Sequence, residues 1–329
     1  MGEDAFAELV ERHTRELRLH CYRMTGSLGE AEELVQETFL KAWRALDGFE
    51  GRSSIRAWLY RIATNACLDA LARAPARVLP DQLGPPSDPS ASAPGRTDLA
   101  WLQPFPDRLL EATPTPEPGP EEAAVAKETI ELAFIAAIQH LSPRQRAAVI
   151  LADVLDWRSK QIAEVLDTSD AAVDSTLLRA RRALGARLPR RRSEWGAAAA
   201  PTAAERATLR RYMEAIEDAD LDAMATLLAR EVRTMMPPLP TWFEGRDAVL
   251  GALATSWDPR SPAYVGRLRL VETEANRRPA LASYARREGD PAFTPFAITV
   301  LEIADGTVVE ATAFHDASLF AAFGLPGSL

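Results

Sequence analysis

Two stretches of this sequence combine residue types that bind nucleic acid. In the first, Trp58, Arg61 and Asn65 are spaced three and four residues apart, which places them on one flank of a predicted helix. Arginine side chains contact phosphate groups, and aromatic and amide side chains can hold unstacked bases, as single-strand binding requires. Further residues of these types lie nearby: Phe49, Arg52, Arg56 and Tyr60. A solvated arginine face over a core tryptophan would give the same pattern, so this helix alone does not decide the function.

The second stretch, residues 159–188, has the pattern of a helix-turn-helix. A short predicted helix meets a tight turn near Asp167, and Ser169 caps the helix that follows. Apolar residues at helical spacing predict the buried stripe of that second helix: Val173, Leu177, Ala180, Leu184 and Leu188. The opposite side, free to enter a major groove, carries Ala171, Ser175, Arg179 and Arg182. A plain three-helix bundle is the alternative.

The net charge of −9 is unfavourable for a free nucleic-acid binder, but the charge is unevenly distributed. Residues 141–192 carry 11 basic and 6 acidic side chains, whereas the stretches on either side are net acidic. From Ser175 to Arg192 there are seven arginines and no acid. The positive charge is therefore concentrated on the predicted helix-turn-helix and the residues that follow it.

Length and composition narrow the class of protein. A chain of 329 residues, 47% of them apolar, is long enough for two or three domains with sizeable cores. No apolar run approaches the roughly 18–20 residues of a membrane helix, and the stretch Met1 to His13 is acidic, unlike a signal peptide. Cys21 and Cys67 form neither a disulfide framework nor a metal-ligand spacing. We expect a cytoplasmic protein with two buried thiols, no metal and no cofactor.

The elements that carry the first stretch are helical. Three helices are predicted before residue 75, from apolar residues that recur near a 3.6-residue period. The second begins at Ser27, with Glu30 three residues on as a capping box, and the third begins near Ser53 or Ser54. The loop between them, residues 47–52, contains two glycines.

A proline-rich segment separates the two stretches. Residues 75–120 hold 12 of the 24 prolines, which disfavours long helices or strands and predicts a linker. Inside it, residues 101–110 form an apolar island that a solvated spacer would not need. We therefore expect this island to dock against a folded domain through Trp101, Phe105 and Leu109. A second break is predicted at residues 189–201.

The last part of the chain has a different pattern. Residues 202–230 and 248–255 are predicted to be helical. Strand-like stretches follow at residues 264–272, 280–287, 296–303 and 308–314. Asp305-Gly306, between the last two, is a hairpin signal. Helices followed by an antiparallel sheet imply a compact α+β unit.

The order of these pieces resembles a known family. The runs ELVQETFLKAW (33–43) and SIRAWLYRIATNACLD (54–69) resemble region 2 of the extracytoplasmic-function (ECF) sigma factors of bacterial RNA polymerase. The runs LSPRQR (141–146), IAEVL (162–166) and RARRAL (179–184) resemble region 4. The end of the chain, at residues 236–246 and 314–326, resembles the SnoaL-like domain that some ECF subgroups carry.

The resemblance implies a fold and a set of domains. The fold class is multidomain, with two all-α domains followed by a cone-shaped α+β SnoaL-like domain. The implied domains are region 2 (1–74), the linker with its docking island (75–120), region 4 (121–190), a short linker (191–203) and the SnoaL-like domain (204–329).

The resemblance also implies partners, which are core RNA polymerase and promoter DNA. The residues that would dock on the clamp helices of the largest polymerase subunit are Leu34, Val35, Gln36, Phe39 and Trp43. Those that would open and hold the −10 element are Phe49, Arg52, Arg56, Trp58, Arg61 and Asn65. Those that would recognise the −35 element are Asp170, Ala171, Asp174, Ser175, Arg179 and Arg182.

The chain departs from the family pattern at three positions. Asp174 and Thr176 stand where many family members have Lys and Arg, and Asp167 replaces a usual turn glycine. An aspartate can accept a hydrogen bond from cytosine but repels phosphate. We therefore expect an altered −35 preference and weak DNA binding by region 4 alone.

The function that these observations favour is a sigma factor without bond chemistry of its own, modulated by its SnoaL-like domain. One rival is a one-component helix-turn-helix regulator with a ligand-sensing C-terminal domain, which leaves the region 2 pattern unexplained. Another is an enzyme with a DNA-binding appendage. His315 and Asp316 are its polar candidates, but adjacent residues on a strand point to opposite faces and make no ready dyad. Whether the C-terminal domain binds a small ligand stays open.

Overall fold

The computed structural model describes residues 3–49, 54–89, 98–110, 130–185 and 200–329. The chain divides into two compact units. The helical unit comprises Met1–Arg77 and Leu109–Ala198, and the C-terminal unit comprises Val78–Arg108 and Ala199–Leu329. The described part of the predicted 75–120 linker therefore groups mostly with the C-terminal unit.

The first half of the helical unit begins with three helices, α1 (Glu3–Thr25), α2 (Leu28–Ala45) and α3 (Ile55–Leu71). Their starts were predictable: the hydroxyl of Ser27 accepts from Glu30 N, and that of Ser54 accepts from Ala57 N. The predicted capping box at Ser27 is only half formed. Its backbone N–H donates to Thr25 Oγ1, and the Glu30 carboxylate pairs with Arg77 at 2.6 Å.

The second half contains the predicted helix-turn-helix. Its elements are α5 (Leu132–Ile138), α6 (Pro143–Val149), a π-helical turn (Ile150–Val154), α7 (Ser159–Leu166) and α8 (Asp170–Gly185). Asp167 ends α7 in the left-handed conformation, with φ 48°, which an aspartate tolerates better than most residues. The stripe predicted for α8 is buried from Val173 to Leu184, and Leu188 lies outside the described residues.

Polar capping also fixes the start of α6. The Ser142 hydroxyl accepts from Gln145 N, and Gln145 Oε1 accepts from Ser142 N, so the capping box is complete. Pro143 occupies the first turn, where no backbone N–H is needed. The predicted helix start at Ser142-Pro143 is confirmed.

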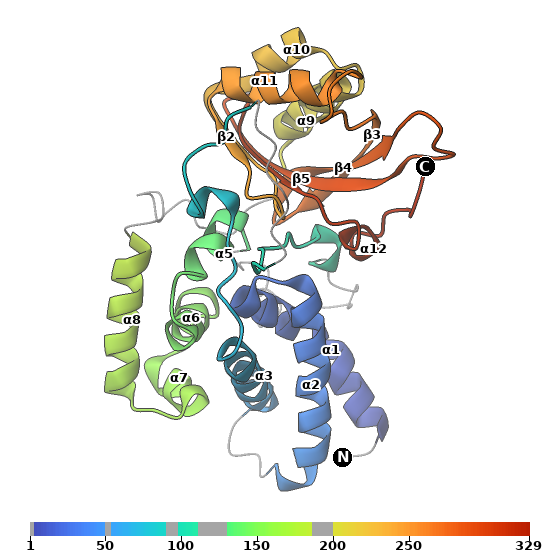
Figure 1. Ribbon diagram of the computed structural model, residues 1–329. Coiled ribbons are helices and arrows are strands. Elements are labelled where there is room, and N and C mark those ends of the chain that lie inside the picture. The colour runs from blue at the N-terminus through green and yellow to red at the C-terminus, as the bar shows by residue number, and fades with distance from the viewer. Residues whose placement is uncertain (1–2, 50–53, 90–97, 111–129, 186–199) are drawn as a thin grey trace. The chain divides into compact units, whose positions relative to one another are not determined.

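The C-terminal unit packs helices on a six-stranded sheet of order β2-β1-β6-β5-β4-β3. Its helices α9 (Ala203–Glu217), α10 (Leu221–Leu227) and α11 (Arg246–Trp257) lie together on one side of the sheet, and α12 (Leu319–Ala322) lies near the C-terminus (Figure 1). The strands are β1 (Leu228–Met235), β2 (Trp242–Glu244), β3 (Arg267–Ala275), β4 (Arg278–Arg286), β5 (Thr294–Ala304) and β6 (Thr307–Phe314). Apolar residues of the helices and of the facing strands form the core between them.

Two expectations for this unit were wrong. The helix predicted over residues 202–230 is broken at Ala219, whose φ of 54° ends α9, and its last three residues belong to β1. The charged residues of β1 fit a helix pattern, but Val232 and Met235 are buried as in a strand. The sheet is also mixed rather than antiparallel, because β1 runs parallel to β6.

The predicted hairpin is confirmed. Asp305 and Gly306 both have positive φ between β5 and β6, as a two-residue turn of this kind requires. A second turn, Asn276-Arg277, uses the same conformation between β3 and β4. Among the described residues, no helix is long and apolar enough to cross a membrane.

Gly266, just before β3, gives a test of this fold. Its φ is +93°, and a Cβ there would lie 2.6 Å from the backbone oxygen of Arg286. Gly266→Ala should lower the local stability of the β3–β4 pair by at least about 2 kcal/mol, because a backbone clash adds to backbone strain. Hydrogen exchange of the β3 and β4 amides measures it.

Gly289→Ala is the matched control. Its φ is +90°, but nothing lies within 4 Å of the added Cβ, so only the backbone strain remains. Equal acceleration of exchange in both variants would contradict the close approach at Gly266.

Candidate nucleic-acid interface

Helix α3 presents part of the predicted strand-binding flank to solvent. Arg61 and Asn65 are exposed, one turn apart. Trp58 is buried, with its ring 4.9 Å from that of Phe49, which comes from the loop after α2. Arg52 lies outside the described residues. The structure thus brings Phe49 and Trp58 together and leaves the arginine and the amide accessible beside them.

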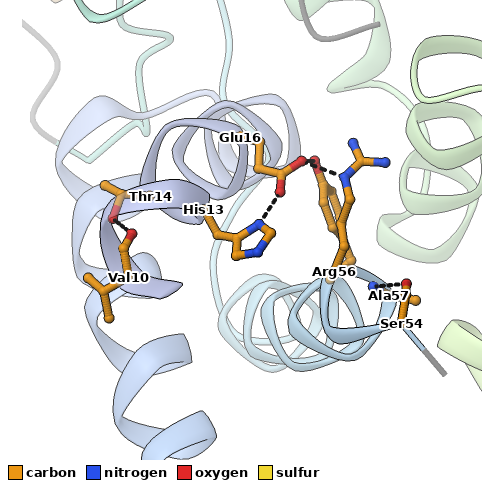
Figure 2. Close-up of polar contacts among 8 residues, drawn as sticks. Val10, His13, Thr14, Glu16, Ser54, Arg56 and Ala57 are labelled. Carbon is orange, nitrogen blue, oxygen red and sulfur yellow. Dashed lines mark hydrogen bonds and ion pairs between the residues drawn. The ribbon is translucent and has the colours of Figure 1, made fainter. Parts of the chain in front are cut away.

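Arg56, at the start of the same helix, is held by a buried carboxylate. Its Nε donates to Glu16 Oε2 at 2.7 Å, and the Tyr60 hydroxyl donates to the same oxygen at 3.2 Å. Glu16 Oε1 lies 2.5 Å from His13 Nδ1, one turn earlier on α1. Figure 2 shows Glu16 between His13 and Arg56, with the Ser54 cap beside them at the start of α3. The cluster joins α1 to α3 at the predicted DNA-binding flank.

The charges of this cluster follow from its burial. Burial alone would raise the pKa of Glu16, but the hydrogen bond with His13 and the charge of Arg56 outweigh it and hold that pKa below its ordinary value. His20 lies on the same helix and is fully buried, which lowers its pKa to about 3 and keeps its ring neutral. Its Nε2 lies 2.9 Å from the Thr64 hydroxyl of α3.

The helix-turn-helix half packs on this three-helix half within the helical unit. The Trp157 ring, just before α7, lies 5.3 Å from the Tyr60 ring of α3. Arg146 of α6 is buried and donates to the backbone oxygen of Met24 at the end of α1. Gln139 Nε2 also donates to the backbone oxygen of Arg23, at 3.4 Å. The last turn of α1 is therefore a docking point for the second half.

Arg146 keeps its charge in this site without a carboxylate among its hydrogen-bond partners. Besides Met24 O, its guanidinium donates to Gln139 Oε1 and to three backbone oxygens, those of Ile138, Gln139 and Leu141. Burial lowers the pKa of Arg146 to about 10, which still leaves it charged at neutral pH. A cation at the carboxyl end of α1 is also favoured by the helix dipole.

The predicted polymerase-docking residues of α2 divide into two groups. Leu34, Val35 and Phe39 are buried in the core of the helical unit. Gln36 is exposed, and Trp43 is 43% exposed although its ring lies 4.8 Å from that of Phe6. Sequence analysis missed Leu40, which is 57% exposed and lies between them on the helix. The exposed α2 face is thus Gln36, Leu40 and Trp43.

All six predicted −35 residues lie on α8, and five of them are exposed polar or charged side chains. The sixth, Ala171, is exposed too, so the face has no bulky group near its start. The Asp174 carboxylate accepts from the Ser159 hydroxyl of α7 at 2.6 Å, which ties the two helices of the motif together. Arg181 is paired with Asp153 at 2.5 Å, so its charge is matched within the motif.

The apolar island packs within the C-terminal unit. Phe105 is fully buried. Its backbone N–H donates to Asn276 Oδ1 at 2.8 Å, and its backbone oxygen accepts from the Asn276 N–H at 2.9 Å. The Asp107 carboxylate accepts from Arg277 N at 3.0 Å. Trp101 is half-buried and pairs with Val78 in a short parallel β-bridge. Leu109, at the end of the island, is also half-buried, but it belongs to the helical unit.

The polar candidates at the end of β6 make no dyad. Burial lowers the pKa of His315 to about 4, and its ring packs 4.8 Å from that of Phe296. The Asp316 carboxylate accepts from the backbone N–H and hydroxyl of Ser318, which makes it a turn cap. In the described part of the chain no group of three His, Cys, Asp or Glu could hold a metal ion. Cys21 and Cys67 are free and buried, as predicted.

Three family models match the chain in order. They are Sigma-70 region 2 (residues 9–76), Sigma-70 region 4 (131–184) and the SnoaL-like domain (209–311). The first two correspond to the two halves of the helical unit, and the third falls within the C-terminal unit.

Relatives match the chain along most of its length. The chain is 44% identical over 326 residues to the ECF RNA polymerase sigma factor SigG of Mycobacterium tuberculosis, covering 98% of this chain and 85% of that protein. It is 27% identical to SigJ of the same organism, covering 88% and 84%. The crystal structure of SigJ matches with a TM-score of 0.62 over 97% of this chain and all of that one, at 23% identity.

The buried carboxylate predicts a pH-dependent contribution to stability. Glu16→Gln should lower the free energy of unfolding of the helical unit by about 2 kcal/mol at pH 7, because it removes the charge that pairs with Arg56. The pKa of folded Glu16 lies below the ordinary 4.5, so this contribution is complete above that pH and is lost as the pH falls through the lower folded value. Urea unfolding at several pH values measures both.

Glu8→Gln is the control on the same helix. Glu8 is 74% exposed and its pair with Arg12 spans 3.6 Å, so its loss should change stability by less than about 0.5 kcal/mol. A Glu16→Gln deficit that stays constant down to acid pH would contradict the assignment of the charge.

Proposed function

The chain belongs to the extracytoplasmic-function sigma factors, and from that membership we propose that it binds core RNA polymerase and directs promoter recognition and opening. The observation that carries this is the 44% identity to a named ECF sigma factor along 98% of the chain. The family consists of transcription initiation factors rather than enzymes. A one-component regulator would leave the match to Sigma-70 region 2 without a role. Polymerase and promoter are cytoplasmic, which places the action of this chain there.

The function divides between the two halves of the helical unit. The flank of α3 holds the opened −10 strand, with Arg61 and Asn65 exposed to it and Arg56 oriented by Glu16. The α8 face enters the major groove of the −35 element. A net charge of −9 makes the free chain a weak DNA binder, so promoter affinity depends on the polymerase.

The core polymerase binds the exposed face of α2. Gln36, Leu40 and Trp43 follow one another at i, i+4 and i+7, and two of them are large apolar side chains in water. Adjacent exposed apolar side chains that form one patch mark interaction sites, whereas single ones are common on protein surfaces. Leu34, Val35 and Phe39 support the face from beneath, since they pack in the core.

The C-terminal unit modulates promoter recognition and opening through residues 101–108, which pack against it. The contacts of Phe105 and Asp107 with the Asn276-Arg277 turn fix residues 101–108 on the C-terminal unit. This segment lies in the chain between the two halves of the helical unit. The state of the C-terminal unit therefore constrains the connection between the two promoter-binding halves.

The α2 face can be tested directly. Leu40→Ala and Trp43→Ala should each weaken the association of the full chain with core RNA polymerase by about tenfold or more, as for central residues of protein interfaces. Run-off transcription from a cognate promoter should fall in parallel. Pull-down of core polymerase, followed by run-off assays at several sigma concentrations, measures both.

Leu83→Ala is the matched control, because Leu83 is an exposed leucine of the C-terminal unit. It should leave polymerase binding unchanged. No association of the wild-type chain with core polymerase would refute the proposed function, and full binding by both α2 variants would refute the placement of the interface.

The modulation has a separate test. Asp107→Ala removes the acceptor for Arg277 N, so amide exchange in residues 101–108 should become faster and the amount of run-off transcript should change by more than about twofold. Asp258→Ala, which breaks an exposed pair with Arg260 in the same unit, should do neither. Faster exchange with unchanged transcription would refute modulation through this segment.

A further inference from the structure

Helix α8 carries an exposed leucine that the core of the helical unit does not use. Leu178 is 53% exposed, whereas its neighbours Leu177 and Leu184 on the same helix are 5% exposed. Leu178 follows Asp174 by four residues and precedes Arg182 by four, so it lies in the middle of the outward face. Sequence analysis passed over it, because a leucine at helical spacing fits a core stripe equally well.

The charges around Leu178 indicate which partner covers it. Arg179 and Arg182 lie near it and are exposed, and the chain contains no acid from Ser175 to Arg192. Negative charge on this face is confined to its start, at Asp170 and Asp174, so positive charge dominates from Leu178 onward. Such a surface is complementary to a polyanion. An apolar protein partner would meet unmatched positive charge here, and a second copy of this chain has no regular polyanionic backbone to offer. The face therefore fits a DNA duplex.

The chemistry of the major groove then identifies the contact. Base pairs present hydrogen-bond donors and acceptors there, and thymine alone adds an apolar group, its C5 methyl. A leucine cannot satisfy the donors and acceptors, but it can bury a methyl group. We propose that Leu178 contacts a thymine methyl in the −35 element and makes the chain selective for thymine at that position. The inference rests on the proposed function and deepens it.

The helix geometry also relates this contact to its neighbour. Asp174 is held by Ser159 and lies one turn before Leu178, about 6 Å along the helix axis. Successive base pairs are about 3.4 Å apart along the duplex, so Asp174 and Leu178 would contact bases separated by about two base pairs or fewer. A carboxylate accepts from cytosine N4. The preferred −35 element thus places the thymine within about two base pairs of a cytosine.

The test removes the methyl group alone. Promoters are first selected with core polymerase and the full chain from a pool randomised over the −35 element. Each thymine in the selected element is then replaced by deoxyuridine, which lacks only the C5 methyl. The concentration of holoenzyme that gives half-maximal run-off is measured at one fixed salt concentration, for the wild type, Leu178→Ala and Leu178→Met.

One deoxyuridine substitution should raise the half-maximal concentration of the wild type about fourfold, the effect of burying one methyl group. Leu178→Ala should need about fourfold more holoenzyme on the thymine promoter and show no further response to deoxyuridine. Leu178→Met keeps an apolar side chain and should retain the response. Leu83→Ala, an exposed leucine elsewhere in the chain, should behave as the wild type.

Two results would overturn the inference: no thymine position at which the wild type responds by twofold, or an unchanged response in Leu178→Ala. Both leave the proposed function intact, because the wild type still initiates from the selected promoters. A wild-type chain that supports no run-off from any selected template is a failure of the proposed function itself, and the inference falls with it.

Discussion

Several charged side chains are buried along helix α1, and the arrangement of the helical unit depends on how two of opposite sign, Glu16 and Arg146, are satisfied. A charge removed from water is costly unless its hydrogen-bonding capacity is filled. The Glu16 carboxylate achieves this with partners from α1 and α3, and the Arg146 guanidinium achieves it with five oxygens from α1 and the α5–α6 corner. Each solution requires the helices in one register. The hydrogen bonds of Glu16 therefore fix the flank of α3, and those of Arg146 fix the position of α6, which begins the helix-turn-helix half.

The charge distribution explains how an acidic chain can still serve a DNA-directed function. The net charge is −9, yet from Ser175 to Arg192 the chain has seven arginines and no acid, so the outward face of α8 is positive beyond Asp170 and Asp174. Arg181 is neutralised by Asp153, so part of this positive charge stabilises the motif instead of the interface. Exposed arginines such as Arg61 on α3 provide a second, smaller positive surface. Repulsion from the rest of the chain opposes DNA binding by the chain alone, in keeping with the proposal that its promoter contacts depend on the polymerase.

Local chemistry made much of this structure predictable. The caps at Ser27, Ser54 and Ser142, the turn at Asp167 and the hairpin at Asp305-Gly306 involve residues within four positions of one another, and all were legible in the sequence. Strand β1 was not, because its charged residues fit a helix and its pairing with β6 joins positions far apart in the chain. The Glu16–Arg56 pair was missed for the same reason, since 40 residues separate its members. His13 and Glu16 at helical spacing were the available signal, but they did not identify the third partner.

The candidate interfaces show a limit of a different kind. Periodicity identifies which residues of a helix share a side, but it does not say whether that side meets the core or a partner. On α2 the family resemblance grouped Leu34, Val35 and Phe39 with Trp43, and the structure separates them by burial. Leu40 and Leu178 were overlooked because a leucine is expected in the core. Each instead is more than half exposed, Leu40 beside the exposed Trp43 and Leu178 among polar and charged residues. In the proposed complex the partner supplies their missing contacts, an apolar surface at α2 and a methyl-bearing groove at α8.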